Sequence, residues 1–382
     1  MKTFDEINEK IKKGSVVVAT AEELIGRVAE VGVKKAAEQV DVVTTATFGP
    51  MCSSGAFLNF GHSEPPIRMA SIWLNDVSAY GGIAAVDTYI GATQPSETRG
   101  LEYGGAHVIE DLIAGKSVHL KATSPGTDCY PRREIETTIS LDSINQAYLY
   151  NPRNVYQNYA SATNASERTI HTYMGTLLPS YGNVTYTTSG ELSPLLKDPQ
   201  LRAIGMGTRI FLGGGEGYIA WEGTQFTRGH QTFNDGEERY AGGTLALIGD
   251  MRGMNPRYIR AASFTGYGVS LFVGVGIPVP VLDEELCAQL AVTNAHLHTF
   301  IYDYSEPTRS RTALTRVSYE QLRSGSVELN GRQVKTAPLS SLKMAREIAF
   351  ELKAWIAEGK MHLQAPIAAL GSGRAINPLE IQ

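Results

Sequence analysis

Cys52 is the residue whose setting most clearly suggests chemistry, and it is one of only three cysteines in the chain. It lies in "GPMCSSG", directly after the strand-like run "VVTTAT" of residues 42–47. Glycine and proline stop the strand, and the small residues 53–55 leave room around a sulfur atom. A structural cysteine would more naturally lie inside an apolar run. We therefore interpret this loop as one that presents a reactive thiol.

Cys129 has a comparable setting in the turn-rich segment "TSPGTDCYPRRE", which follows the alternating, strand-like "SVHLKA". Arg132 and Arg133 come next, and a nearby guanidinium favours the thiolate. A helix beginning at "SSGAFLN" would act in the same way on Cys52. Loops at strand ends often carry catalytic groups, so both thiols are candidate nucleophiles. The alternative is that both are ordinary buried thiols, the usual state of free cysteine.

Cys287, in "DEELCAQL", fits the buried side of a helix, where a thiol is packing. An odd number of widely spaced cysteines excludes a disulfide framework, and the absence of Cys-x-x-Cys argues against a zinc ribbon. We expect no metal site. A site in which three separated cysteines meet to hold an iron–sulfur cluster stays open.

Composition limits the class of protein. The chain has 382 residues, 42% of them apolar, which is enough for a large core. Its net charge of -5 gives no basic footprint for nucleic acid. The N-terminus has no apolar signal region, and the most apolar stretch, 271–282, is too short and too broken by glycine and proline to span a bilayer. We expect a cytoplasmic protein with no nucleic-acid or membrane partner.

Helical and strand patterns alternate in the first third of the chain. Residues 20–40 predict one helix, with Thr20 as its N-cap and Glu23 three residues later. A strand over 42–48 follows, and a short helix from 107 leads to the strand before Cys129.

The residue pattern changes in the middle of the chain. Residues 134–280 contain many short runs rich in Tyr, Thr and Val between glycine clusters, which is typical of β structure, and residues 340–360 predict a helix. We predict a mixed α and β fold with N-terminal α/β segments, a β-rich middle and a helical C-terminus. It forms one large unit over 1–382, with a helical appendage from about 338 to 382.

A glycine cluster at Gly213, Gly214 and Gly215 could bind an anion through a row of backbone N–H groups. The alternative, a tight turn between two strands, is slightly favoured because the segment lacks the Lys-Ser/Thr of a phosphate loop. His230, in the polar segment "TRGHQTF", is a candidate acid or base beside a substrate.

Several segments together resemble the homocysteine biosynthesis, sulfur-incorporation family of anaerobic archaea and bacteria. They are "TTATFGPMCSSGAFLNFGHSEPPIR", "AYGGIAAVDTYIGATQ", "GGAHVIEDLIAGKSVHLKA", "GTDCYPRRE" and "RIFLGGGEGYIAWEGTQF". The resemblance implies a sulfurtransferase that places sulfide-level sulfur on the aldehyde carbon of L-aspartate semialdehyde, after which two electrons reduce the product to homocysteine. Cys52 and Cys129 match the family's two functional cysteines, and Cys287 matches none.

The sequence also departs from the fuller family pattern. Some relatives carry a pair of CBS modules, and related systems use a ferredoxin-like protein or domain as electron source; neither module is recognisable in these 382 residues. The resemblance therefore implies no intrinsic cofactor, a separate ferredoxin-like iron–sulfur partner and, we expect, a homo-oligomer.

Two hypotheses follow. In the first, the protein is an enzyme in which Cys52 carries sulfur as a persulfide, Cys129 resolves it, and Arg132 or Arg133 with the 213–215 glycines holds the substrate carboxylate. In the second, it is a persulfide or redox carrier that relays sulfur to a separate enzyme. A cavity joining the two cysteines would favour the enzyme, and we predict that Cys52 and Cys129 approach each other.

Overall fold

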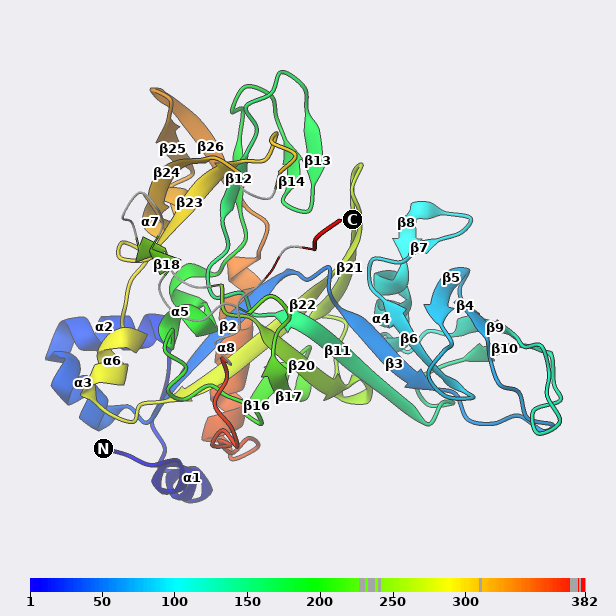
Figure 1. Ribbon diagram of the computed structural model, residues 1–382. Coiled ribbons are helices and arrows are strands. Elements are labelled where there is room, and N and C mark those ends of the chain that lie inside the picture. Colours follow the sequence, from blue (N-terminus) through cyan, green and yellow to red (C-terminus); the bar gives the residue numbers. More distant parts are fainter. Residues whose placement is uncertain are drawn as a thin grey trace.

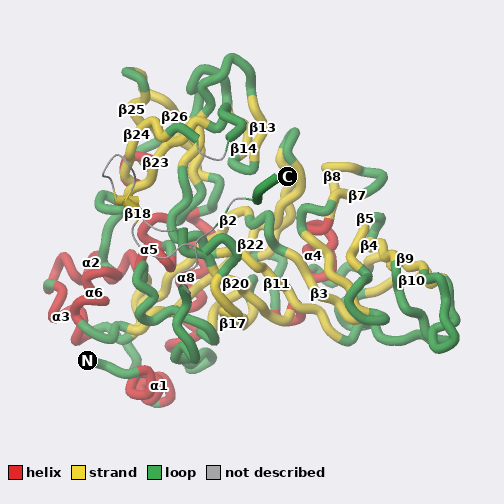
Figure 2. The backbone as a smooth tube through the Cα atoms, viewed as in Figure 1, coloured by secondary structure: helices red, strands yellow, loops and turns green. Residues whose placement is uncertain are grey.

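The structure, a computed structural model, describes residues 1–226, 231–232, 238–239, 242–308, 311–371, 377 and 379–381. These residues form a mixed α and β fold, which confirms the predicted class. Figure 1 shows a lobe with α1 to α3 at the N-terminal side, an upper lobe and a lobe at the right, all joined through a central sheet. In Figure 2 the strands form a nearly continuous layer from β2 to β10.

The central sheet has 16 strands among the described residues, in the order β1-β2-β22-β16-β17-β20-β11-β3-β6-β5-β4-β9-β10, with β21 on β22 and with β7 and β8 beside β5. Their bounds are β1 (Val18–Thr20), β2 (Val42–Pro50), β3 (Gly55–Asn59), β4 (Ser71–Leu74), β5 (Val77–Tyr80), β6 (Asp87–Gly91), β7 (Pro95–Ser96), β8 (Gly100–Gly104), β9 (Val118–Thr123), β10 (Glu134–Ile139), β11 (Gln146–Asn154), β16 (Arg209–Leu212), β17 (Gly215–Glu222), β20 (Leu245–Asp250), β21 (Ile259–Phe264) and β22 (Gly268–Pro280).

A second sheet forms the upper lobe, in the order β24-β23-β12-β15-β26-β25. Its strands are β12 (Ser161–Thr163), β15 (Val184–Tyr186), β23 (His298–Asp303), β24 (Ala313–Ser318), β25 (Ser326–Leu329) and β26 (Arg332–Pro338). Two small hairpins are made by β13 (Ile170–Thr172) with β14 (Gly175–Leu177) and by β18 (Gln231–Thr232) with β19 (Glu238–Arg239).

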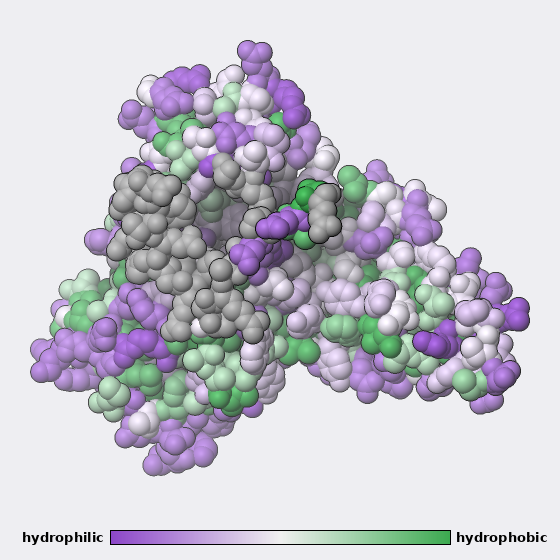
Figure 3. Space-filling model, in the orientation of Figure 1, coloured by the Kyte–Doolittle hydropathy of each residue, from purple (hydrophilic) through white to green (hydrophobic). Residues whose placement is uncertain are grey.

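Helices lie around these sheets. They are α1 (Phe4–Lys12), α2 (Ala21–Val31), α3 (Val33–Gln39), α4 (Gly105–Ile113), α5 (Pro194–Lys197), α6 (Glu284–Leu290), α7 (Tyr319–Arg323), α8 (Leu342–Ala357) and the 3₁₀ turns η1 (Gly190–Leu192) and η2 (Met251–Gly253). None of the helices in the described part of the chain is long and apolar enough to cross a membrane. Figure 3 shows polar residues over most of one face, with apolar residues scattered among them.

The helical segment after β1 begins where the sequence predicts. Thr20 accepts a hydrogen bond from the backbone N–H of Glu23, whose carboxylate accepts one from the N–H of Thr20. The prediction of one helix over 20–40 is wrong, because Gly32 at φ 80° and ψ 160° separates α2 from α3. Only glycine adopts that conformation readily, so the chain turns between two short helices.

The longest strand pair, β2 with β22, forms the core beneath α8. In α8 the residues Ala345, Ile348, Ala349, Leu352 and Ile356 are buried at helical spacing. Gly274 and Gly276 of β22 have no side chain, which lets Ile348 pack directly on the sheet. The predicted 340–360 helix is confirmed, but it is part of the core and not an appendage, and the described residues from 358 to 371 form no further helix.

The chain crosses between the two halves of the central sheet at Cys52. β2 pairs with β22 in one half, whereas β3 pairs with β11 and β6 in the other. The residues "GAFLN" therefore form a strand. The suggestion that a helix begins there and favours a Cys52 thiolate is wrong, because neighbouring strands supply the backbone hydrogen bonds of this segment.

Candidate active site

Cys52 occupies a tight turn that its neighbours hold in place. The backbone N–H of Ser54 donates to the carbonyl of Met51 at 3.1 Å, and the Ser54 hydroxyl donates to the same carbonyl at 2.7 Å. The side chain of Asn151, which is completely buried on β11, donates to the Ser54 hydroxyl. These bonds join the turn to the adjacent strand, so the sulfur position is fixed by the sheet.

Two hydroxyl groups contact the half-buried sulfur of Cys52. The Oγ of Ser270 lies 3.4 Å from Sγ, and the hydroxyl of Tyr267 lies 3.9 Å from it and donates to it. Tyr267 lies in the tight turn between β21 and β22, next to Gly266 at φ 65°, and Ser270 follows within β22. Hydrogen-bond donors of this kind stabilise negative charge on sulfur. Burial raises the pKa of Tyr267 above its ordinary value, and the neighbouring Cys52 raises it further.

A cavity of about 320 Å³ lies beside this sulfur, between the central sheet and the upper lobe. The turn at Cys52 and the end of β11 form one wall, and Thr187 and Thr188, which follow β15, form another. Tyrosine side chains form much of the rest, from positions 156, 159, 173 and 267. Among the described residues that line the cavity there is no histidine, aspartate, glutamate or lysine. Its chemistry therefore depends on hydroxyls, one thiol and one cation.

That cation is Arg153, which follows the Asn-Pro pair of β11. Its backbone carbonyl accepts a hydrogen bond from Ser53, so its position is tied to the Cys52 turn. The Nε atom is buried without a hydrogen-bond partner, and no described carboxylate lies within 4.0 Å of the guanidinium. A partly buried guanidinium whose Nε atom is buried without a partner carries a desolvation cost. An anionic ligand in the cavity would supply the missing partner.

The tyrosines pack against one another and not only against the cavity. The rings of Tyr173 and Tyr267 meet edge to face, with centroids 6.1 Å apart. The hydroxyl of Tyr173 donates to that of Tyr304 at 3.3 Å, and Arg311 lies over the Tyr304 ring at 4.0 Å. Aromatic packing of this kind gives the cavity a rigid, half-apolar wall.

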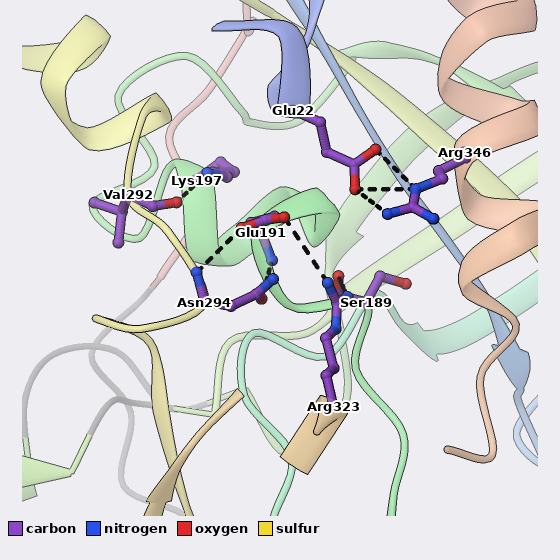
Figure 4. A network of polar contacts seen from close by, with 8 residues as sticks. All are labelled: Glu22, Ser189, Glu191, Lys197, Val292, Asn294, Arg323 and Arg346. Atoms are coloured by element: carbon purple, nitrogen blue, oxygen red, sulfur yellow. Dashed lines mark hydrogen bonds and ion pairs between the residues drawn. The ribbon is translucent and has the colours of Figure 1, made fainter. Parts of the chain in front are cut away.

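A polar network supports the wall that carries Thr187 and Thr188 (Figure 4). Glu191 accepts a hydrogen bond from the backbone of Asn294, and its own N–H donates to the Asn294 side chain. Arg323 pairs with Glu191 at 3.9 Å and donates to the carbonyl of Ser189. The segment from β15 to α5 is thus fixed to the upper lobe by partly buried bonds, two of which are reciprocal between Glu191 and Asn294.

Lys197 closes the same segment at the end of α5. It is completely buried, and its ammonium donates to the carbonyl of Val292 (Figure 4). Burial lowers the pKa of Lys197 to about 7. It does not line the cavity, so we assign it a structural position.

The structure does not bring Cys129 to Cys52. The strands β3 and β9 run in the same direction, with β6, β5 and β4 between them, so four strand spacings of ~4.8 Å place them about 19 Å apart across the sheet. Cys52 precedes β3, whereas Cys129 follows β9, so the two loops leave opposite ends of these strands. A disulfide needs Cα atoms within roughly 7 Å. The predicted approach of the two thiols within one chain is therefore wrong.

Cys129 is exposed in the loop that joins β9 to β10. This loop lies at the outer end of the right-hand lobe in Figure 1. Arg132 donates to the carbonyls of Glu64 and Pro65, and Arg133 is exposed. Neither arginine lines the cavity beside Cys52.

The remaining predicted site residues also lie away from the cavity. Gly213, Gly214 and Gly215 form the β16–β17 turn, packed against Ile259 and Asn255, and the N–H of Gly213 already donates to the carbonyl of Gly274. His230 lies outside the described residues. Cys287 is completely buried in α6, as predicted, and burial raises its pKa.

The three cysteines do not converge. No group of three His, Cys, Asp or Glu side chains that could hold a metal ion occurs in the described part of the chain. The cavity residues that sequence reasoning missed are Arg153 and Tyr267. Arg153 lies near the end of β11, after an Asn-Pro pair that the sequence shows, so the strand-end criterion that selected Cys52 could have found it, whereas no local signal marks Tyr267.

Comparisons with known proteins add a family match. Residues 16–363 match the model of a family described as homocysteine biosynthesis enzyme, sulfur-incorporation. The chain is 53% identical over 369 residues to an L-aspartate semialdehyde sulfurtransferase of Methanosarcina acetivorans, covering 97% of this chain and 72% of that protein. It is 53% identical over 386 residues to the protein of the same name from Methanocaldococcus jannaschii, covering 97% and 74%. No solved structure matches.

Proposed function

Because the chain belongs to the homocysteine biosynthesis, sulfur-incorporation family, we propose that it transfers sulfide-level sulfur to L-aspartate semialdehyde, with Cys52 as the sulfur-carrying nucleophile. The two relatives that are 53% identical carry that substrate in their names. Sulfur transfer in homocysteine biosynthesis is the activity of the family, and the substrate and the roles of residues are our assignment.

One observation carries the proposal: the thiol of Cys52 and the unpaired guanidinium of Arg153 face the same cavity. L-aspartate semialdehyde has a carboxylate at one end and an aldehyde at the other. Arg153 is suited to hold the carboxylate through charge-assisted hydrogen bonds. The aldehyde carbon is then directed toward the sulfur at Cys52, and a cavity of about 320 Å³ accommodates so small a molecule.

The first half of the reaction builds the new carbon–sulfur bond. The outer sulfur of a Cys52 persulfide attacks the aldehyde carbon, the carbonyl π electrons move to oxygen, and the oxygen takes a proton. A second thiolate then attacks the Cys52 sulfur, which breaks the sulfur–sulfur bond, releases the substrate as R–CH(OH)–SH and leaves a protein disulfide.

The second half of the reaction regenerates the Cys52 persulfide and the second thiolate, and it reduces the released intermediate. Hydrosulfide attacks the disulfide at Cys52, which regenerates the persulfide and frees the second thiolate. R–CH(OH)–SH loses water to give a thioaldehyde, and two electrons and two protons from an external ferredoxin-like reductant convert it to homocysteine. The net reaction consumes one aldehyde, one hydrogen sulfide, two electrons and two protons, and it yields homocysteine and water.

We assign the second thiol to Cys129 of a second copy of this chain. Within one chain the loops of the two cysteines leave opposite ends of β3 and β9, whereas Cys129 is exposed on a projecting hairpin that another molecule can meet. The proposal therefore includes a homo-oligomer in which each Cys52 cavity receives the hairpin of its neighbour.

Anaerobic incubation with sulfide, L-aspartate semialdehyde and a chemical reductant tests the function, with homocysteine as the product. Cys52→Ser abolishes turnover, because a serine hydroxyl cannot carry a persulfide. Cys129→Ser alone is also inactive over repeated turnovers. In an exchanged, equal mixture of the two variants, half of any dimers are mixed and each mixed dimer has one complete site, so turnover recovers to about a quarter of wild type by this counting of cysteine pairs.

No recovery in the mixture refutes the role of a second copy. A wild-type protein that makes no homocysteine while it still accepts sulfur at Cys52 would be a persulfide carrier. The expected cavity joining the two cysteines is not present, since Cys129 does not line the cavity beside Cys52. The unpaired cation in that cavity still supports the enzyme, because a carrier needs only an accessible thiol.

A further inference from the structure

The proposed reaction needs a proton donor in the cavity, and the described residues that line the cavity leave one kind of side chain for that role. Addition of sulfur to an aldehyde carbon places negative charge on the carbonyl oxygen, and this charge must be stabilised and protonated. The usual proton donors are histidine, carboxylic acids and lysine, and none of these is among the described residues that line the cavity. Among the described lining residues, the hydroxyl groups of tyrosine are the remaining acids.

Of the lining tyrosines, Tyr267 is the one whose hydroxyl contacts the reacting sulfur. Its hydroxyl lies 3.9 Å from Sγ of Cys52 and points toward it. The hydroxyl of Tyr173, by contrast, donates to Tyr304 and is directed into the aromatic cluster. Ser270 touches the sulfur at 3.4 Å, but it is completely buried and does not line the cavity.

We propose that Tyr267 is the catalytic acid that protonates the carbonyl oxygen when the sulfur at Cys52 adds to the aldehyde. This inference rests on the proposed function. As the carbon–sulfur bond forms and the carbonyl π bond breaks, the oxygen accepts the proton of the Tyr267 hydroxyl. The tyrosinate then recovers a proton from water.

The distances suit this step. In a persulfide the outer sulfur extends ~2 Å from Sγ, and the carbonyl carbon lies one further bond length away. The Tyr267 hydroxyl lies 3.9 Å from Sγ, so when the persulfide is directed toward it, the oxygen on the attacked carbon comes within hydrogen-bond reach of that hydroxyl.

Two further features of Tyr267 fit the role. A tyrosine hydroxyl is protonated at neutral pH at its ordinary pKa, and burial beside Cys52 raises the pKa of Tyr267 further, so the acid is present before each addition. The side chain is 38% exposed, which gives the opposite side of the ring access to the water that returns the proton. The turn that carries it is fixed by the N–H of Tyr267, which donates to the carbonyl of Phe264 at 3.0 Å.

The experiment separates sulfur loading from sulfur transfer in Tyr267→Phe. Inorganic polysulfide loads Cys52, and mass spectrometry of the peptide containing "GPMCSSGAF" measures the added sulfur. The loaded protein is then mixed with L-aspartate semialdehyde, and loss of that sulfur gives the rate of transfer. Tyr267→Phe loads within about twofold of wild type, and its transfer step is about 100-fold slower, as expected for a lost general acid.

A matched control is Tyr258→Phe, whose ring packs against Phe211 outside the cavity; it loads and transfers like wild type. A solvent deuterium isotope effect on transfer is present in wild type and absent in Tyr267→Phe. Transfer at the wild-type rate by Tyr267→Phe overturns the proposal, and so does a loading defect as large as the transfer defect, because it would assign Tyr267 to sulfur binding. Failure of wild type to transfer sulfur refutes the proposed function instead.

Discussion

Replacement of Arg153 by glutamine tests whether the cavity recognises a carboxylate. The guanidinium is partly buried, its Nε lacks a partner, and no described carboxylate neutralises it. Two hydrogen bonds from a cation to a carboxylate contribute about 3 kcal/mol after a discount for partial exposure. Arg153→Gln therefore raises KM for L-aspartate semialdehyde by about 150-fold. The effect falls mainly on KM, because the carboxylate is bound equally in the ground state and in the transition state.

Arg132→Gln is the matched comparison, because the sequence favoured Arg132 or Arg133 as the carboxylate ligand. Arg132 donates to the carbonyls of Glu64 and Pro65, so its loss costs about 1 kcal/mol of local stability and leaves KM within about twofold. An aldehyde of equal length without the carboxylate provides a second check. For wild type, KM for this aldehyde is higher than KM for L-aspartate semialdehyde by about the same factor by which Arg153→Gln raises KM. For Arg153→Gln, the two aldehydes have similar KM values.

Steady-state kinetics under anaerobic conditions, with folding confirmed by thermal melting, give the answer. If Arg153→Gln keeps the wild-type KM while Arg132→Gln raises it, the cavity assignment is refuted. The carboxylate would then bind at the hairpin that carries Cys129.

Two further predictions concern buried groups outside the cavity. Cys287→Ala leaves turnover unchanged and lowers the free energy of unfolding by about 1 kcal/mol, because it removes a small buried group from a core helix. Urea titration measures this change. A loss of turnover in a folded variant would contradict the packing role. Lys197 has a folded-state pKa of about 7, below its unfolded value, so between about pH 7 and 10 the unfolded chain binds more protons and stability rises with pH. Lys197→Met removes this rise, so urea unfolding of the two proteins should differ most below pH 7; equal slopes would refute the assignment.

Local sequence patterns correctly predict those helices and strands that are determined by residues close together in the sequence. The Thr20 cap, the strand into Cys52 and the buried spacing of α8 follow from side chains a few positions apart, and all three are present. The prediction of one helix over 20–40 is wrong at a single residue, Gly32. Its backbone conformation ends the helix, and the spacing of apolar residues cannot reveal this. The prediction of a helix at "GAFLN" is wrong for a different reason. This segment forms a strand because it pairs with β6 and β11, which are distant in sequence.

The site was harder to predict because of the topology of the sheet. The prediction that Cys52 approaches Cys129 rests on both lying in strand-end loops, and such loops share one edge of a sheet only when the strands are parallel. In the central sheet most pairs are antiparallel, and Cys52 connects two strands of different halves. A position after a strand therefore says nothing about which end of the sheet a loop reaches. Cys52 and Cys129 each lie in a loop that follows a strand, as predicted, but the two loops lie at opposite ends of the parallel strands β3 and β9.

The cavity itself explains why Arg153 and Tyr267 had to come from the structure. It lies between two sheets and draws on segments near residues 52, 153, 173, 188 and 267, so no window of sequence contains more than a fragment of it. Yet its chemistry is coherent once assembled. Hydrosulfide, a cysteine persulfide, a substrate carboxylate and the oxygen that receives charge during addition are all anionic, and the described lining supplies one cation, several hydroxyl donors and no carboxylate. A site that admitted an aspartate or glutamate would repel each of these species, so the lack of acidic side chains in that lining is itself a requirement of the proposed reaction.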